Sequence, residues 1–97
     1  MPIFMMFGKY NQDSLKGAST ERTKKAFKII EKNGGTVVSM FAVLGEHDLV
    51  FTLDFPDMEK ALSASAELSM MTGISFSTSP AVDVEHYDHL ISQIEKL

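Results

Sequence analysis

The chain has 97 residues, and its nine Lys and Arg against thirteen Asp and Glu give a net charge of −4 at pH 7. This length has room for one domain, which we expect to span residues 1–97. The hydrophobic content of 44% is too high for a disordered chain, so we expect a folded core. The absence of cysteine excludes disulfides, thiolate nucleophiles, Cys-ligated zinc and iron–sulfur clusters.

The apolar start of the chain does not have the form of a secretory signal. No basic region precedes residues 1–7, and Lys9 and Tyr10 follow too soon. No apolar run approaches the ~20 residues of a membrane span. We therefore expect a cytoplasmic protein with no membrane partner.

The charges are unevenly distributed, with a net charge of +2 over residues 1–48 and −6 over residues 49–97. An acidic chain with a single basic stretch and no recognised motif is not typical of a nucleic-acid binder, so we expect no nucleic-acid partner. We interpret the basic stretch as a solvated helix face, and the alternative is a site for phosphate or a partner protein. Its five cations are Arg22, Lys24, Lys25, Lys28 and Lys32.

Turn and capping residues separate the predicted strands and helices. Aromatic and β-branched residues predict strands over residues 3–10, 36–44, 48–55 and 74–79. Helical periodicity and capping residues predict helices that begin near residue 20, at residue 57 and after residue 83. Polar turn residues occupy residues 11–17, and residues 45–47 form the turn of a β-hairpin.

The element order β-α-β-β-α-β with a further C-terminal helix predicts an α+β, ferredoxin-like fold, with two helices on one face of an antiparallel sheet. Three predicted helices have an apolar face, and the second of these faces is predicted to turn inward. The three faces are Ala26, Phe27 and Ile30; Met58, Ala61, Leu62, Leu68 and Met71; and Val84, Tyr87, Leu90, Ile91, Ile94 and Leu97.

Both faces of the predicted sheet are apolar. In the strand at residues 36–44, for example, strict alternation puts Val37 and Phe41 on one face and Val38, Met40 and Leu44 on the other. A sheet with helices on only one side needs another cover for its second apolar face. We therefore predict a homodimer in which two sheets pack face to face, with the C-terminal helix wrapping an edge or reaching the partner.

Three segments of the chain carry a resemblance to a known family. They are residues 43–50, the start of the chain with Gly8-Lys9-Tyr10, and residues 68–78, which read LSMMTGISFST. Together they resemble the GYD domain family over nearly the whole chain. The resemblance implies a dimeric α/β-barrel of ferredoxin-like subunits and no particular activity. Gly45 and Asp48 match the family's Gly-x-Tyr-Asp motif, whereas His47 replaces the usual Tyr, so no role for a phenolic hydroxyl is implied there.

The same hairpin motif is similar to that in the ligand-binding domains of leucine-responsive-type transcription regulators, which are small-molecule sensors built on a similar dimeric barrel. We expect only the sensor half of this comparison to apply, since no DNA-binding segment precedes the motif in the sequence given.

The hairpin residues Gly45, His47 and Asp48 are candidate site residues. A structural explanation exists, because a tight hairpin needs a residue with positive φ and an Asp in a turn accepts hydrogen bonds from backbone amides. The functional alternative is that loops on rigid scaffolds often hold binding groups. A histidine side chain suits general-base chemistry near neutral pH, so His47 would act as a general base beside Asp48, although adjacent strand residues point to opposite faces.

Tyr10 and Asp54 add polar groups that would line a pocket between sheet and helices. The alternative for Tyr10 is an edge position with its hydroxyl in water. The candidate catalytic residues are thus His47, Asp48, Tyr10 and Asp54, and the candidate ligand-binding residues are Tyr10, Gly45, His47 and Asp48.

His86 and His89 lie three residues apart on the last predicted helix, with Glu85 nearby, and are candidates for a metal pair. Without a third ligand two surface histidines bind metal weakly, so we expect a solvated face and no metal or cofactor.

The function we infer is a small-ligand-binding or regulatory homodimer with an adaptable apolar interior, which seven Met and seven Phe favour. The ligand would be small and apolar. The alternative is a cofactor-independent oxygenase or isomerase that acts on an apolar small molecule, and the sequence leaves the presence of catalysis open.

Overall fold

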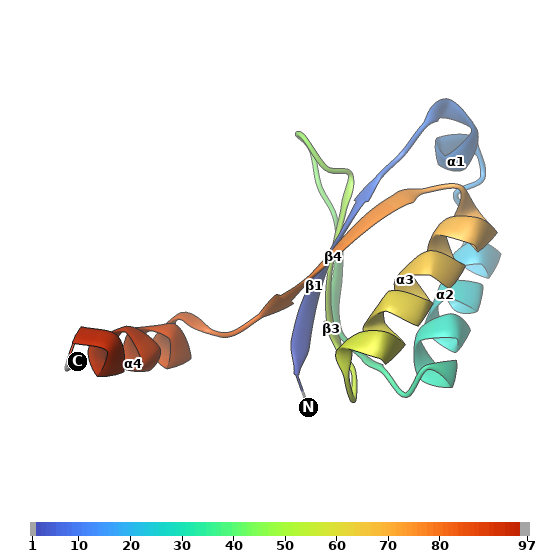
Figure 1. Ribbon diagram of the computed structural model, residues 1–97. Coiled ribbons are helices and arrows are strands. Elements are labelled where there is room, and N and C mark those ends of the chain that lie inside the picture. Colours follow the sequence, from blue (N-terminus) through green and yellow to red (C-terminus); the bar gives the residue numbers. More distant parts are fainter. Residues whose placement is uncertain (1, 96–97) are drawn as a thin grey trace.

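The computed structural model describes residues 2–95 and confirms the ferredoxin-like α+β fold (Figure 1). Two helices, α2 and α3, lie against one face of a sheet with the strand order β2-β3-β1-β4. The elements in chain order are β1 (Ile3–Lys9), α1 (Gln12–Lys16), α2 (Thr20–Lys32), β2 (Thr36–Ala42), β3 (Leu49–Asp54), α3 (Met58–Thr72), β4 (Ser75–Ala81) and α4 (Val84–Glu95).

The strand pairings are all antiparallel, and β1 lies in the middle between β3 and β4. In its register Met6 is opposite Phe51 on one side and Thr78 on the other. Because side chains alternate along a strand, this register puts one row of each strand against the helices and the next row on the uncovered side.

The hydrophobic core lies between the sheet and the two helices. On the sheet side Phe4, Met6, Phe51 and Leu53 are almost completely buried. Thr78 adds a polar link, since its hydroxyl donates to Ser65 Oγ of α3 at 2.8 Å. The helix side is formed by small and aliphatic residues that let the helices lie close to the sheet: Ala26, Ile29, Ile30, Ala61, Ala64 and Leu68.

The opposite sheet face, which we call the open face, has no helix over it among residues 2–95. Its central part is apolar and only half-buried, and its β4 edge is lined by serines. The exposed fraction of Phe41, on edge strand β2, is 62%. Its apolar residues are Ile3, Met5, Phe7, Phe41 and Val50.

A β-bulge in β2 corrects the predicted faces of this strand. The register shifts between Val37 and Ser39, so Val37 is opposite Leu53 while Met40 is opposite Phe51. Both therefore pack on the core, and Phe41 lies on the open face, not beside Val37 as strict alternation predicted. The bulge inserts one residue and reverses the phase of the alternation.

The inward helix faces also differ from the prediction in detail. In α2 the buried residues are Ala26, Ile29 and Ile30, whereas Phe27 is exposed. In α3 the prediction was wrong for Met58 and Leu62, which are exposed. The small residues Ala64 and Ser65 take the inward positions, because close helix–sheet packing leaves little space for long side chains there.

The predicted turn at residues 11–17 contains the short helix α1. Asn11 caps it with a capping box, since its side chain accepts from Ser14 N at 2.7 Å while Ser14 Oγ accepts from Asn11 N. The polar residues that predicted a turn here act as a helix cap instead.

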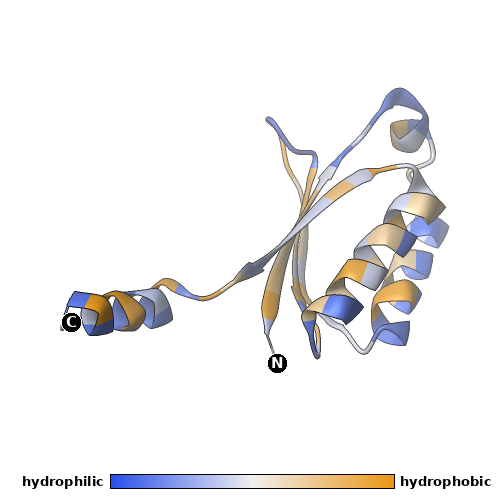
Figure 2. Ribbon diagram, in the orientation of Figure 1, coloured by the Kyte–Doolittle hydropathy of each residue, from blue (hydrophilic) through white to orange (hydrophobic). Residues whose placement is uncertain are grey.

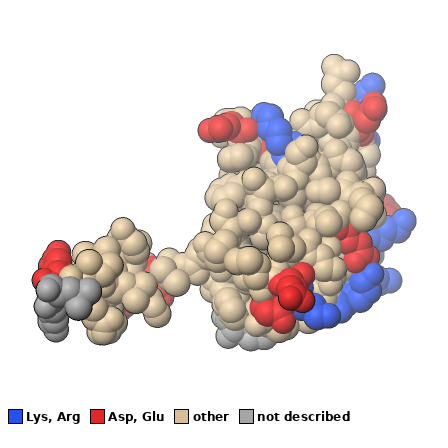
Figure 3. Space-filling view, viewed as in Figure 1, with Lys and Arg blue, Asp and Glu red and all other residues tan. Residues whose placement is uncertain are grey.

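Helix α4 extends away from the rest of the molecule on an extended connection (Figure 1), and the space-filling view shows it apart from the body (Figure 3). Its residues are all at least partly exposed, including the predicted apolar stripe of Val84, Tyr87, Leu90, Ile91 and Ile94. Figure 2 shows this apolar colouring along the helix. Leu97, also assigned to the stripe, lies outside the described residues.

No helix within residues 2–95 has the length and hydropathy that a bilayer crossing requires.

Candidate functional site

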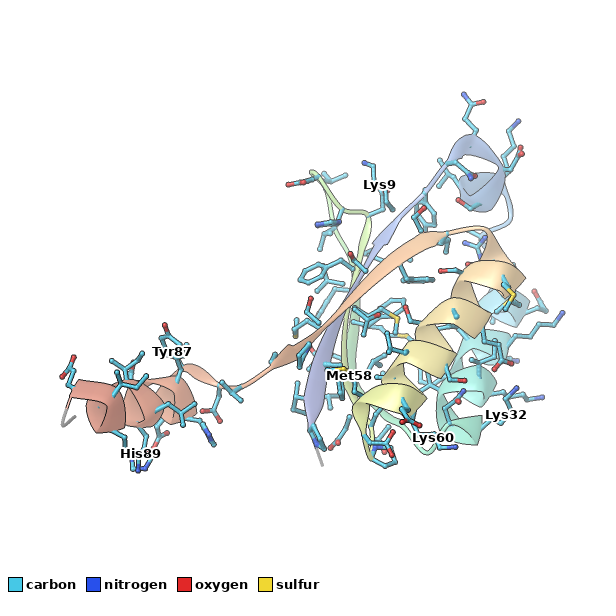
Figure 4. The ribbon with its side chains drawn as sticks, viewed as in Figure 1. Lys9, Lys32, Met58, Lys60, Tyr87 and His89 are labelled. Carbon is cyan, nitrogen blue, oxygen red and sulfur yellow. The ribbon has the colours of Figure 1, made fainter. Side chains whose placement is uncertain are left out.

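Asp48 ties the β2–β3 hairpin to the end of β1. Its carboxylate Oδ2 accepts a hydrogen bond from Tyr10 N at 2.9 Å and lies 3.8 Å from Lys9 Nζ. Its backbone N–H donates to Gly8 O, and its carbonyl accepts from Val43 N, both at 2.8 Å. Figure 4 shows Lys9 beside the hairpin. The Asp of the motif thus fixes where the hairpin projects.

The remaining hairpin residues have separate positions. Gly45 lies in the exposed loop with φ of +135°, a conformation that favours glycine. The ring of His47 packs on Phe7, with centroids 5.0 Å apart, and so lies on the open face. His47 and Asp48 therefore have different contacts, as the alternation of strand side chains predicted.

Asp54 lies at the far end of β3, opposite Ile3 of β1 and Thr36 of β2. The hairpin and Tyr10 are at the other end of these strands. Of the four candidate catalytic residues, the structure brings only Tyr10 and Asp48 together, through the backbone amide of Tyr10.

Two hollows share Tyr10 as a wall. The first, which we call the hairpin groove, runs over the surface between the end of β1, α1 and the hairpin, and it is open to solvent. Asp48 is its acidic residue and Lys9 its basic one, while Leu15 and Leu44 supply exposed apolar surface.

The second hollow, which we call the inner cavity, lies between the sheet and helices α2 and α3 and has a volume of about 100 Å³. Its interior is apolar, with side chains from β2, β3, α3 and β4. The polar lining residues are Tyr10, Ser19, Arg22, Thr23 and Thr72. The apolar lining residues are Ala18, Ala26, Met40, Leu49, Phe51, Leu68, Ile74 and Phe76.

Gly8 of β1 lets three side chains that line this cavity pack closely against the β1 backbone. A Cβ added at Gly8 would lie 2.9 Å from Phe76 Cε1 and 3.2 Å from Ile74 Cγ2 and from Leu49 Cβ. These three side chains line the inner cavity, and they approach the β1 backbone this closely because glycine carries no side chain.

Arg22 lines the candidate site, whereas the sequence pattern grouped it with the solvated basic stretch. It is half-buried at the inner cavity, where one guanidinium nitrogen donates to Ser14 O and Cζ lies 5.9 Å from the centroid of the Tyr10 ring. The signal was available, because Arg22 precedes the buried Ala26 and Ile30 by one and two turns of α2 and thus shares their face.

The other cations of the basic stretch behave as predicted. Lys24, Lys25, Lys28 and Lys32 are exposed, and Figure 3 shows basic side chains along the side of the molecule where α2 lies. Lys32 pairs with Glu67 of α3 across the surface.

The two candidate metal ligands lie on α4. His86 N donates to Asp83 Oδ1 at 2.7 Å, and the His89 ring lies 3.3 Å from Gln93 Nε2. Within the described chain no group of three or more His, Cys, Asp or Glu has a geometry suited to a metal ion.

The comparisons with known proteins agree with this architecture. The family model described as the GYD domain matches residues 4–91. The crystal structure of Mycobacterium tuberculosis leucine response regulatory protein (LrpA) is similar, with a TM-score of 0.60 at 11% sequence identity. The match covers 84% of this chain and 51% of that one, so this chain spans about half the length of that protein. No curated protein matches the sequence.

Proposed function

The chain belongs to the GYD domain family, and we propose that it is a homodimeric, small-ligand-binding module with a regulatory role. The observation that carries the proposal is the open face, an apolar sheet surface that residues 2–95 leave uncovered. The fold shared with a leucine response regulatory protein supports the regulatory part.

Two apolar surfaces of the same chain support the dimer. Phe41 is 62% exposed on the open face, and Tyr87 is 54% exposed on α4. Apolar surfaces of this extent are costly in water, and a second copy covers both at once when its sheet packs on the open face and α4 lies along its edge. The occupant we propose is therefore another copy of this chain, in the expected cytoplasmic setting.

The two hollows beside Tyr10 support ligand binding. Tyr10 borders both of them, Asp48 borders the hairpin groove, and Gly45 and His47 lie on the hairpin that forms the groove's outer side. We propose that Tyr10 and Asp48 contact the ligand, and that Gly45 and His47 belong to the site through the shape of the hairpin beside the groove. Binding is favoured over acid–base catalysis, because the candidate acids and bases do not meet in one site.

The test of the dimer is light scattering after size exclusion, with native mass spectrometry to detect any retained small molecule. Phe41→Glu puts a charge on the open face and is expected to produce monomers. Met70→Glu is the matched control, since Met70 is exposed on the outer side of α3 and the change should leave the dimer intact. A wild-type monomer at micromolar concentration would overturn the proposal.

The contribution of α4 to the dimer is tested with two substitutions on this helix. Tyr87 and His89 lie on opposite sides of α4 (Figure 4). Tyr87→Glu is expected to weaken the dimer, whereas His89→Glu introduces the same side chain on the other side and should not. Equal effects of the two variants would show that the apolar stripe does not contact the partner.

A further inference from the structure

The inner cavity is built from a single chain and is shaped for a short apolar group. Met40, Ile74 and Phe76 are among its apolar walls, and its volume is about 100 Å³. An apolar protein cavity of about 150 Å³ binds benzene, so this smaller one fits a branched group of a few carbons.

The one charged side chain among the described residues that line this cavity is the cation Arg22. Arg22 lines it half-buried and makes no ion pair with any carboxylate in residues 2–95. A guanidinium has five N–H donors, and the described contacts use one nitrogen of the group, for Ser14 O. A guanidinium that lines an apolar cavity and has no carboxylate partner favours an anionic ligand, because a carboxylate would accept its remaining N–H donors.

Two further observations narrow the chemical class. The hydroxyl of Tyr10 has no hydrogen-bond partner within the described chain, and Tyr10 lines the cavity with its ring under Arg22, so the hydroxyl is free to donate to a ligand. No Asp or Glu lines the cavity, so an ammonium group placed there would lose water without gaining a counter-charge.

From these contacts we propose that the inner cavity binds a short-chain aliphatic carboxylate. Its apolar tail lies among Met40, Ile74 and Phe76, and its carboxylate accepts hydrogen bonds from Arg22 and Tyr10. An α-amino acid with the same tail binds more weakly. This inference rests on the ligand-binding half of the proposed function and is independent of the dimer, since one chain supplies the whole cavity.

The test is an NMR titration of the full chain with its methionine methyl groups labelled with ¹³C. Met40 lines the cavity and reports on it, whereas Met5 on the open face and Met70 on α3 are internal controls. The probe is isobutyrate. Three matched probes are isobutanol, which lacks the charge, isobutylamine, which reverses it, and 2-aminoisobutyrate, which adds an ammonium group to the same skeleton.

We expect isobutyrate to shift the Met40 methyl signal in a saturable way and to leave the Met5 and Met70 signals in place. The alcohol, the amine and the amino acid should each bind about tenfold more weakly or worse, because each loses a charge-assisted hydrogen bond or adds an unpaired charge. Isobutanol binding as tightly as isobutyrate would overturn the assignment of the anion, and an unmoved Met40 signal would overturn the site.

Three variants distinguish a direct role of Arg22 in binding from an effect of net charge or of altered folding. Arg22→Gln should weaken isobutyrate binding about tenfold or more. Lys28→Gln is the matched control on the same helix, since Lys28 is exposed and does not line the cavity. Ala18→Leu narrows the exposed side of the cavity, keeps Arg22 and should weaken isobutyrate binding as well. Unchanged affinity in both Arg22→Gln and Ala18→Leu would contradict the proposal.

The outcomes distinguish this inference from the proposed function. In a second sample with ¹³C-labelled leucine methyl groups, shifts confined to Leu15 and Leu44 would place the carboxylate in the hairpin groove, which overturns the inner site and leaves a ligand-binding module. A monomeric protein whose Met40 signal responds to isobutyrate would overturn the dimer and retain the inference.

Discussion

The two faces of one sheet differ in how their apolar residues are covered. Leu53 and Val50 lie on the same strand, yet Leu53 is completely buried under the helices while Val50 is half-buried on the open face. Covered residues complete their contacts within the chain, whereas open-face residues keep part of their apolar surface exposed within residues 2–95. The sequence pattern of β1, β2 and β3 is apolar on both faces, so composition alone does not distinguish the covered face of these strands from the open one.

The largest expected effect comes from the covered face. Leu53→Ala removes a fully buried side chain from β3 and should lower the free energy of unfolding by about 2–5 kcal/mol. The loss, measured by urea unfolding against the wild type, should be the same at two protein concentrations, because this contact lies within one chain. A loss that changes with concentration would place Leu53 in the interface and break the comparison.

The polar link on the covered face should have the next largest effect. Thr78→Val removes the hydroxyl that donates to Ser65 Oγ and leaves the buried Ser65 without it, at a cost of about 1–2 kcal/mol in unfolding free energy. The double variant Thr78→Val with Ser65→Ala should recover most of this, since no unpaired group remains. Additive losses in the two single variants and the double variant would contradict this explanation.

Val50→Ala sharpens the comparison on the open face. In dilute protein the loss in unfolding free energy should be about 1 kcal/mol, because the side chain is half-buried within its own chain. The loss should increase with protein concentration, because dimerisation stabilises the folded state in proportion to what the interface buries. Thermal unfolding over a series of protein concentrations measures the loss in dilute protein and its concentration dependence. A loss in unfolding free energy that does not change with concentration would indicate that the open face stays in water.

The smallest effect is expected on the outer surface of the helices. Glu67→Gln removes the ion pair with Lys32, which is solvent-accessible, and should change the unfolding free energy by less than about 1 kcal/mol. High salt should remove the difference between the variant and the wild type, since exposed charges are screened. A larger or salt-independent loss would show that Glu67 has a packing role.

Much of the fold follows from periodicity. Apolar residues with strand and helix spacing predicted the order of the main elements and the ferredoxin-like class, because tertiary packing selects the same faces that the spacing creates. The β-bulge at Val38 was not predicted, since it depends on the pairing of β2 with β3 and not on local sequence. Helix α1 was not predicted, because the residue types that cap a helix are the same as those that form turns.

The candidate site was predicted less completely. The contact of Tyr10 with Asp48 agrees with the structural explanation of the motif, as a carboxylate that accepts from a backbone amide. Arg22 was grouped with its neighbouring lysines by charge, although its spacing from Ala26 indicates the inward face. His47 and Asp54 are separated by the length of β3, a distance that a list of polar residues does not reveal.

The extended connection before α4 has a consequence for protease resistance. Val82 and Asp83 are exposed between β4 and a helix without buried residues, so a protease can reach the backbone there. Cleavage at this connection would release α4 and leave the sheet and its two covering helices joined. In a dimer that holds α4 against the partner, the rate of cleavage at this connection should fall as protein concentration rises. Limited proteolysis of this one connection would therefore measure assembly.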